Sequence, residues 1–147
     1  MKKIIALIVV CIMMFSFTGC EKKDDGNTLD VFYLNIDATA TVPEKYELKS
    51  SDESVDKQVD ELLDKLSSKP DDSKLRKTIP DDVEIRKHEE NAYSCTIDFS
   101  KSYYDMTAAE EVLMRASVVR TLTQLEQITY VMFTVDKAPL MNSDGEI

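Results

Sequence analysis

The side chains that could carry out catalysis are few and follow no known catalytic pattern. His88 is the only histidine, and it falls in or beside a polar turn, where we expect a surface histidine. No serine lies in the G-x-S-x-G pattern of a nucleophile elbow that could pair with it. Cys95 falls on the apolar face of an expected strand, which indicates a small core residue. These residues predict no enzyme.

Metal and cofactor signals are equally weak. One histidine and three cysteines do not give the ligand spacing of a zinc site, and the chain has no glycine-rich phosphate loop. Neighbouring carboxylates such as Asp81 and Asp82 point apart on a strand or helix, so they form no ready acid–base pair. Asp81 and Asp82 are candidates for weak calcium binding, but the residues around them do not have the spacing of a calcium loop. We therefore predict no cofactor, no metal and no small-molecule substrate.

Cys20 is the residue whose surroundings predict a definite modification. Two lysines precede an apolar run, Ile4 to Phe17, which is shorter than the roughly 20 residues that span a bilayer. The run leads through Gly19 into Cys20 and resembles a bacterial lipoprotein box, in which the cysteine is acylated and becomes the mature N-terminus. We predict a lipid on Cys20. A plain signal peptide with an incidental cysteine and an uncleaved anchor helix are the alternatives.

Composition then limits the partners. The formal net charge of −10 repels nucleic acid and anionic headgroups, so we predict no nucleic-acid binding and membrane attachment only through the lipid. The expected organisation is a signal peptide over 1–19, the lipidated cysteine and a polar tether over 20–28, and one domain over 29–147. That length is enough for a single hydrophobic core.

Apolar periodicity predicts the elements of the first half of this domain. A strand is expected over 29–36, followed by a turn and a short extended piece that contains Pro43. Apolar residues at helical spacing predict a helix over 55–66, with Ser50 and Glu53 as a capping box. The opposite face of this helix is acidic and indicates a solvated surface.

The second half alternates and then becomes helical again. Residues 83–99 predict a hairpin with its turn at 89–91, and Tyr93, Cys95, Ile97 and Phe99 sharing a buried face. A helix is expected from Thr107, capped with Glu110, and an apolar central strand over 129–135. The order strand, helix, hairpin, helix, strand predicts an α+β fold: a small mixed sheet with two amphipathic helices packed on one face. The helix after the hairpin is a candidate right-handed crossover.

The C-terminal residues contain a turn signal, NSDG at 142–145, with no return strand after it. We expect either a frayed tail or a truncated product.

Several stretches resemble the GerM domain family of sporulation- and germination-associated lipoproteins and envelope proteins of Gram-positive bacteria. The stretches are VFYLN with TVPEKYEL, VDELLDKL, IPDDVEIR, YSCTIDFSKSY, EEVLMRASVVRTLTQLEQI and YVMFTVD, in an order that covers residues 29–140. Lys137 stands where the family often has a glycine. The resemblance implies a compact unit similar to the ring-building motifs of secretion-system proteins, which associates with copies of itself or with neighbours. It implies no catalytic residues.

These observations predict a non-catalytic, lipid-anchored protein at the outer face of the cytoplasmic membrane. It would act as an interaction or assembly module, sporulation-associated, with envelope proteins or itself as partners. The alternative is a wall module that binds peptidoglycan or another glycan. For that reading Tyr93, Tyr103 and Tyr104 are the candidate groove residues, although Tyr93 is expected to face the core.

Overall fold

The computed structural model describes residues 27–140. The elements in chain order are β1 (Thr28–Asn35), β2 (Thr41–Glu47), α2 (Val55–Ser67), β3 (Leu75–Arg76), β4 (Ile85–Asn91), β5 (Ser94–Phe99), the 3-10 helix η1 (Lys101–Asp105), α3 (Ala108–Leu122), β6 (Tyr130–Val135) and β7 (Ala138–Pro139). The predicted signal peptide, Cys20 and the NSDG turn lie outside the described residues. Within 27–140, neither helix is long and apolar enough to cross a bilayer.

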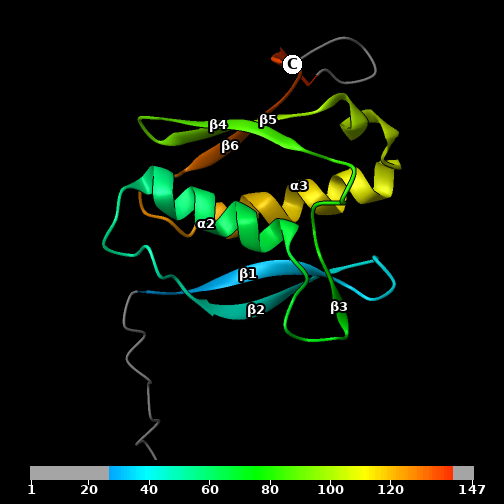
Figure 1. Ribbon diagram of the computed structural model, residues 1–147, viewed down its shortest axis with the longest axis horizontal. Coiled ribbons are helices and arrows are strands. Elements are labelled where there is room, and N and C mark those ends of the chain that lie inside the picture. Colours follow the sequence, from blue (N-terminus) through cyan, green and yellow to red (C-terminus); the bar gives the residue numbers. More distant parts are fainter. Residues whose placement is uncertain (1–26, 141–147) are drawn as a thin grey trace, which may run out of the picture.

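The strands form two sheets, with the helices between them (Figure 1). One sheet has the order β2-β1-β3 and is antiparallel, and the other has the order β4-β5-β6-β7. Helix α2 contacts β1 and β4, and α3 contacts β1, β2 and β6. The predicted α+β class is confirmed. The layers differ from the prediction, because two sheets enclose the helices instead of one sheet carrying both on a single face.

Strand β1 explains why a second sheet forms. β2 pairs along one edge of β1 from Thr28 to Leu34. On the other edge β3 pairs only with Leu34 and Asn35, and side chains from α3 and from just after it bond Asp30 and Phe32. The Thr121 hydroxyl accepts a hydrogen bond from the Phe32 N–H at 3.1 Å, and Gln124 bonds both backbone groups of Asp30. Pro43 of β2 lies opposite Phe32, and the Phe32 N–H donates to Thr121 on the side away from β2. No backbone hydrogen bond between β1 and β2 is therefore lost because Pro43 has no N–H.

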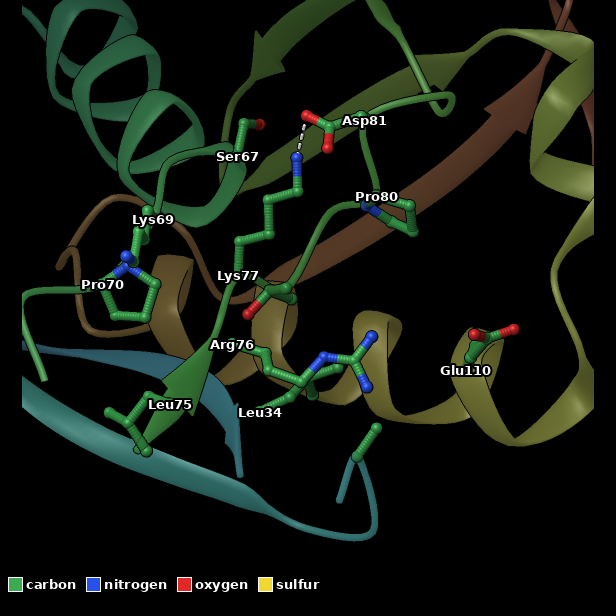
Figure 2. Close-up of a pocket in the computed structure, with 12 residues that line it drawn as sticks. Leu34, Ser67, Lys69, Pro70, Leu75, Arg76, Lys77, Pro80, Asp81 and Glu110 are labelled. Atoms are coloured by element: carbon green, nitrogen blue, oxygen red, sulfur yellow. Dashed lines mark ion pairs between the residues drawn. The ribbon is translucent and has the colours of Figure 1, made fainter. Parts of the chain in front are cut away.

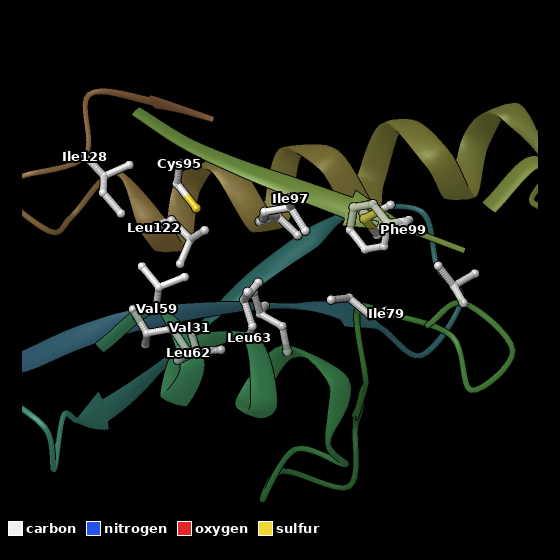
Figure 3. Packing of buried hydrophobic residues seen from close by; sticks show 14 of the residues in the cluster. Val31, Val59, Leu62, Leu63, Ile79, Cys95, Ile97, Phe99, Leu122 and Ile128 are labelled. Atoms are coloured by element: carbon white, nitrogen blue, oxygen red, sulfur yellow. The ribbon is translucent and has the colours of Figure 1, made fainter. Parts of the chain in front are cut away.

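A single core joins both sheets and both helices. Figure 3 shows Val31 of β1, Val59 and Leu62 of α2, and Ile97 of β5 within this cluster. Each of these four side chains is at most 1% exposed, and burying one contributes about 1.5–3 kcal/mol relative to leaving it in water. Because β1 and β5 belong to different sheets, the core holds the two sheets together.

The two helices begin differently from each other. Thr107 caps α3, with its hydroxyl accepting from the Glu110 N–H and Glu110 bonding back, so the predicted capping box is confirmed. The box predicted at Ser50 and Glu53 is wrong. Helix α2 is capped by Ser54 without a side-chain bond. The Ser50 N–H, which Glu53 would have to bond in a capping box, donates to the Glu61 carboxylate instead.

The hairpin is confirmed, but its turn lies further on. β4 continues to Asn91, and Ala92 takes the turn with φ of 54°. This shift places Tyr93 in the turn, where it is 67% exposed, so its predicted core position is wrong. Cys95 is fully buried, as predicted. β5 and β6 are parallel, so α3 is the crossover between them.

Strand β6 turns back at once into a short partner. Asp136 and Lys137 both have positive φ, 51° and 69°, and lead into β7, which pairs with Thr134 and Val135. A two-residue turn with both residues at positive φ is the type I′ hairpin geometry, which favours glycine at its second position. A return strand therefore exists before the NSDG signal, and Lys137 occupies the position where a glycine would be unstrained.

Candidate functional site

One edge of β6 is only partly paired within residues 27–140. β5 pairs with all of β6, but β7 pairs only with Thr134 and Val135 on the other side. Among residues 27–140, no strand pairs with that side of Tyr130, Val131 or Met132. An unpaired strand edge presents N–H and C=O groups that can bond an added strand.

The other long edge strands carry the charges and prolines that discourage such pairing. β4 reads IRKHEEN, and β2 reads TVPEKYE with Pro43 in its middle. β6 reads YVMFTV and contains neither a charge nor a proline. Since charged side chains and proline are the usual protection of an exposed edge, β6 is the edge that the sequence leaves available.

Apolar side chains gather around this edge. Tyr130 is 54% exposed and Met132 is 44% exposed, both on the outer face of β6. Tyr93 lies at the same end of the sheet, because its carbonyl accepts from the Thr129 N–H at 2.7 Å and its neighbour Ser94 pairs with Tyr130. Apolar residues on both faces of β6 predict a helix over one face and partial cover on the other, and on this outer face about half of each of Tyr130 and Met132 is exposed. The outer face of β6 is partly open, and this edge with Tyr93, Tyr130 and Met132 is called the β6 patch below.

A second polar cluster lies where α2 packs against β4. His88 Nε2 is 2.7 Å from Asp60 Oδ1 of α2, and His88 Nδ1 is 2.7 Å from Glu90 Oε1. The imidazole is only 12% exposed, so its predicted place on the surface is wrong. Burial lowers the pKa of His88, but the hydrogen bonds to the two carboxylates outweigh this and hold that pKa above its ordinary value.

This cluster lacks an activated nucleophile. The Cys95 thiol reaches Glu90 at 3.9 Å, but burial, together with the Glu90 charge, raises the pKa of the Cys95 thiol to about 12. A thiol at that pKa is protonated at neutral pH and reacts poorly. Both nitrogens of His88 contact carboxylates, so no serine or cysteine uses this histidine as a base within the described residues.

A cavity of about 660 Å³ opens between the end of α2, β3 and the start of α3 (Figure 2). Lys77, which lines this cavity, forms an ion pair with Asp81. Asp81 is one of the two carboxylates considered above for weak calcium binding. Lys69 and Arg76 form no ion pair within residues 27–140. The Ser67 hydroxyl donates to the Leu63 carbonyl of its own helix and faces no base. This cavity can attract an anion but offers no paired nucleophile.

The tyrosines named for glycan binding do not share one groove. Tyr93 precedes β5 and Tyr103 follows it, and a six-residue strand is about 20 Å long. Tyr103 is 2% exposed and its hydroxyl donates to Glu111, whereas Tyr104 is 63% exposed. The described residues therefore place these rings at opposite ends of a strand.

The comparisons with known proteins agree with this fold. The sequence model of the Germane family, described as sporulation and spore germination, matches residues 30–141. The chain belongs to the Germane family. This membership confirms the resemblance to the GerM domain family and associates the Germane domain of this chain with sporulation and spore germination.

Two solved structures are similar to this Germane domain. The first GerMN domain of the sporulation protein GerM from Bacillus subtilis has a TM-score of 0.60 at 18% identity, covering 77% of this chain and 85% of that one. The tandem GerMN domains of the same protein have a TM-score of 0.62 at 17% sequence identity. This match covers 78% of this chain and 41% of the tandem chain. The chain thus spans less than half of the tandem structure. No curated protein matches the sequence.

Proposed function

We propose that this Germane protein is a non-catalytic, lipid-anchored module that assembles with envelope proteins, or with itself, at the outer face of the cytoplasmic membrane. Family membership supports an association with sporulation. The observation that carries the assembly role is the β6 patch, an uncharged strand edge with exposed Tyr130 and Met132 beside it.

Strand addition is the mode of contact that this patch supports. A partner segment in extended form would bond the backbone groups of Val131, which face the edge that β7 leaves unpaired within residues 27–140, and would extend the four-stranded sheet. The exposed side chains of Tyr93, Tyr130 and Met132 would then bury apolar area against alternate residues of the incoming strand. Backbone bonds would supply affinity, and these three side chains would supply selectivity.

The non-catalytic part of the proposal is supported by the chemistry of the described residues. The buried Cys95 thiol is not activated, and both His88 nitrogens are engaged by carboxylates. The Lys69 and Arg76 cavity has no nucleophile paired with a base.

Capture of partners from cells tests the assembly role. Cells that carry a tagged copy would be crosslinked, and the captured proteins identified by mass spectrometry. We expect defined envelope proteins, or a ladder of the chain itself, to be lost when Met132→Glu places a charge on the edge. Val112→Glu is the matched control, because Val112 is 64% exposed and lies on α3, so the added charge is not on a strand edge. Equal capture by both variants would contradict the role of this edge.

Lipidation of Cys20 needs a separate test, because it lies outside the described residues. We propose the signal peptide over 1–19, the tether over 20–28 and the Germane domain over 29–147. A Cys20→Ala variant should leave the membrane fraction, since about 0.8 kcal/mol for each buried methylene of the lipid would be lost. Full retention of Cys20→Ala in that fraction would overturn the anchor.

Binding to peptidoglycan or another glycan is the alternative outcome. It would appear as sedimentation of the purified chain with cell wall, together with capture of wall fragments and no protein. Separation of Tyr93 from Tyr103 and Tyr104 by the length of β5 weighs against one aromatic groove.

A further inference from the structure

The polar cluster between α2 and β4 brings together the kinds of ligand that bind transition metals. Asp56 of α2 and His88 and Glu90 of β4 each offer one ligand atom, and these three atoms lie within 4.8 Å of one another. His88 and Glu90 are two residues apart on a strand, so their side chains leave the same face. Opposite them in β5 are Ile97 and Cys95, which line the core.

A fourth side chain holds the imidazole in place. Asp60 follows Asp56 by one helical turn on α2, and its Oδ1 is 2.7 Å from His88 Nε2. His88 Nδ1 faces Glu90 instead, at 2.7 Å. In metal sites a ligating histidine usually donates its second N–H to a carboxylate, which fixes the tautomer and the orientation of the ring. Asp60 stands in that position, and the Glu90 side of the ring is left for an ion.

We propose that Asp56, His88 and Glu90 bind a divalent transition-metal ion of the zinc class, with Asp60 as the positioning residue. One imidazole nitrogen and two carboxylate oxygens match the ligand types that zinc accepts, with a further position for water. The ion would replace the proton between Nδ1 and Glu90, and that proton would pass to solvent. Since the ligands come from α2 and β4, the ion would join the helix layer to the four-stranded sheet.

Zinc titration of the purified full-length chain tests this site. With zinc chloride as the only added metal, we expect saturable binding in calorimetry that His88→Ala and Glu90→Gln each weaken at least about tenfold. Asp60→Asn should weaken it by roughly 10–100-fold without removing a ligand. Asp64→Asn is the control, because Asp64 is an exposed carboxylate of the same helix outside the cluster, and its affinity should stay that of the parent. Lack of saturable binding, or equal binding by His88→Ala, would overturn the proposal.

A second measurement avoids dependence on variants that fold poorly. The sequence has one histidine, so its imidazole nitrogens give a single set of resonances in nitrogen-15 NMR of the parent chain. We expect zinc to shift Nδ1 and to leave Nε2 protonated, hydrogen-bonded to Asp60. A spectrum unchanged by zinc would show that acidic surface groups alone collect the ion, and would overturn the site.

Discussion

The hydroxyl of Tyr46 on β2 donates a 2.5 Å hydrogen bond to the carboxylate of Glu61 on α2. The same carboxylate accepts from the backbone N–H groups of Lys49 at 2.9 Å and Ser50 at 2.8 Å. Desolvation raises the pKa of Glu61, but these hydrogen bonds prevail and lower it from 4.5 to about 2. One carboxylate therefore ties β2 and the turn before α2 to the helix.

Acid should weaken this link, and Glu61→Gln should remove the acid dependence. Because the folded pKa lies below the unfolded value, the stabilisation is complete above about 4.5 and is lost as the pH falls toward 2. At neutral pH we expect Glu61→Gln to lower the free energy of unfolding by about 1–3 kcal/mol. Urea unfolding at about pH 7 and about pH 3 measures both effects. Asp64→Asn should follow the parent, and parallel pH curves for Glu61→Gln and the parent would refute the assignment.

The edge of β1 gives a second prediction, with its control on the same helix. Thr121 is fully buried and its hydroxyl is the partner of the Phe32 N–H, so Thr121→Val leaves that buried donor without a bond. We expect a loss of about 1–3 kcal/mol in the free energy of unfolding, at nearly unchanged side-chain volume.

Ser117 is the matched control for that loss. Its hydroxyl is buried and has no hydrogen-bond partner among the described residues, so Ser117→Ala removes an unsatisfied group. This variant should unfold at the same or a higher urea concentration than the parent. If Ser117→Ala costs as much as Thr121→Val, packing and not the hydrogen bond explains both results.

The turn between β6 and β7 gives a third prediction. Lys137 has φ of 69°, which costs a residue with a Cβ about 1 kcal/mol or more, and its N–H donates to Asp98 at 2.7 Å. Lys137→Gly keeps this bond and relieves the strain, so we expect a gain of about 0.5–1 kcal/mol. Lys137→Ala removes the charge but keeps the Cβ, and thermal unfolding should show no gain for it. Equal midpoints for the glycine and alanine variants would argue against the strain.

Local patterns in the sequence predicted the elements well, and tertiary relationships less so. The strands β1, β4, β5 and β6, both helices, the hairpin and the crossover follow from periodicity, whereas the two-residue strands β3 and β7 were not predicted. Thr107 with Glu110 follows from a short capping pattern. The division into two sheets depends on Thr121 of α3 and Gln124 just after it, which bond β1 from about 90 residues away, and no local sequence pattern predicts such contacts.

The polar cluster was missed for a similar reason. The polar residues around His88 in the sequence predict a place in or beside a surface turn. Its actual environment is set by Asp60, which lies 28 residues earlier, on the helix that packs against β4. The available signal was the alternation of His88 and Glu90, which places both side chains on the inner face of the strand opposite Ile97 and Cys95.

The most direct test of the assembly role places a photoreactive amino acid at Met132, on the β6 edge, and in a second strain at Val112, on α3. Both side chains are exposed and apolar, so the two positions differ mainly in the strand edge beside Met132. The account predicts that the probe at Met132 captures a defined envelope protein or a second copy of this chain, through an extended segment, and that the probe at Val112 does not. If Met132 captures nothing beyond what Val112 captures, the open edge of β6 is not where this domain meets its partner.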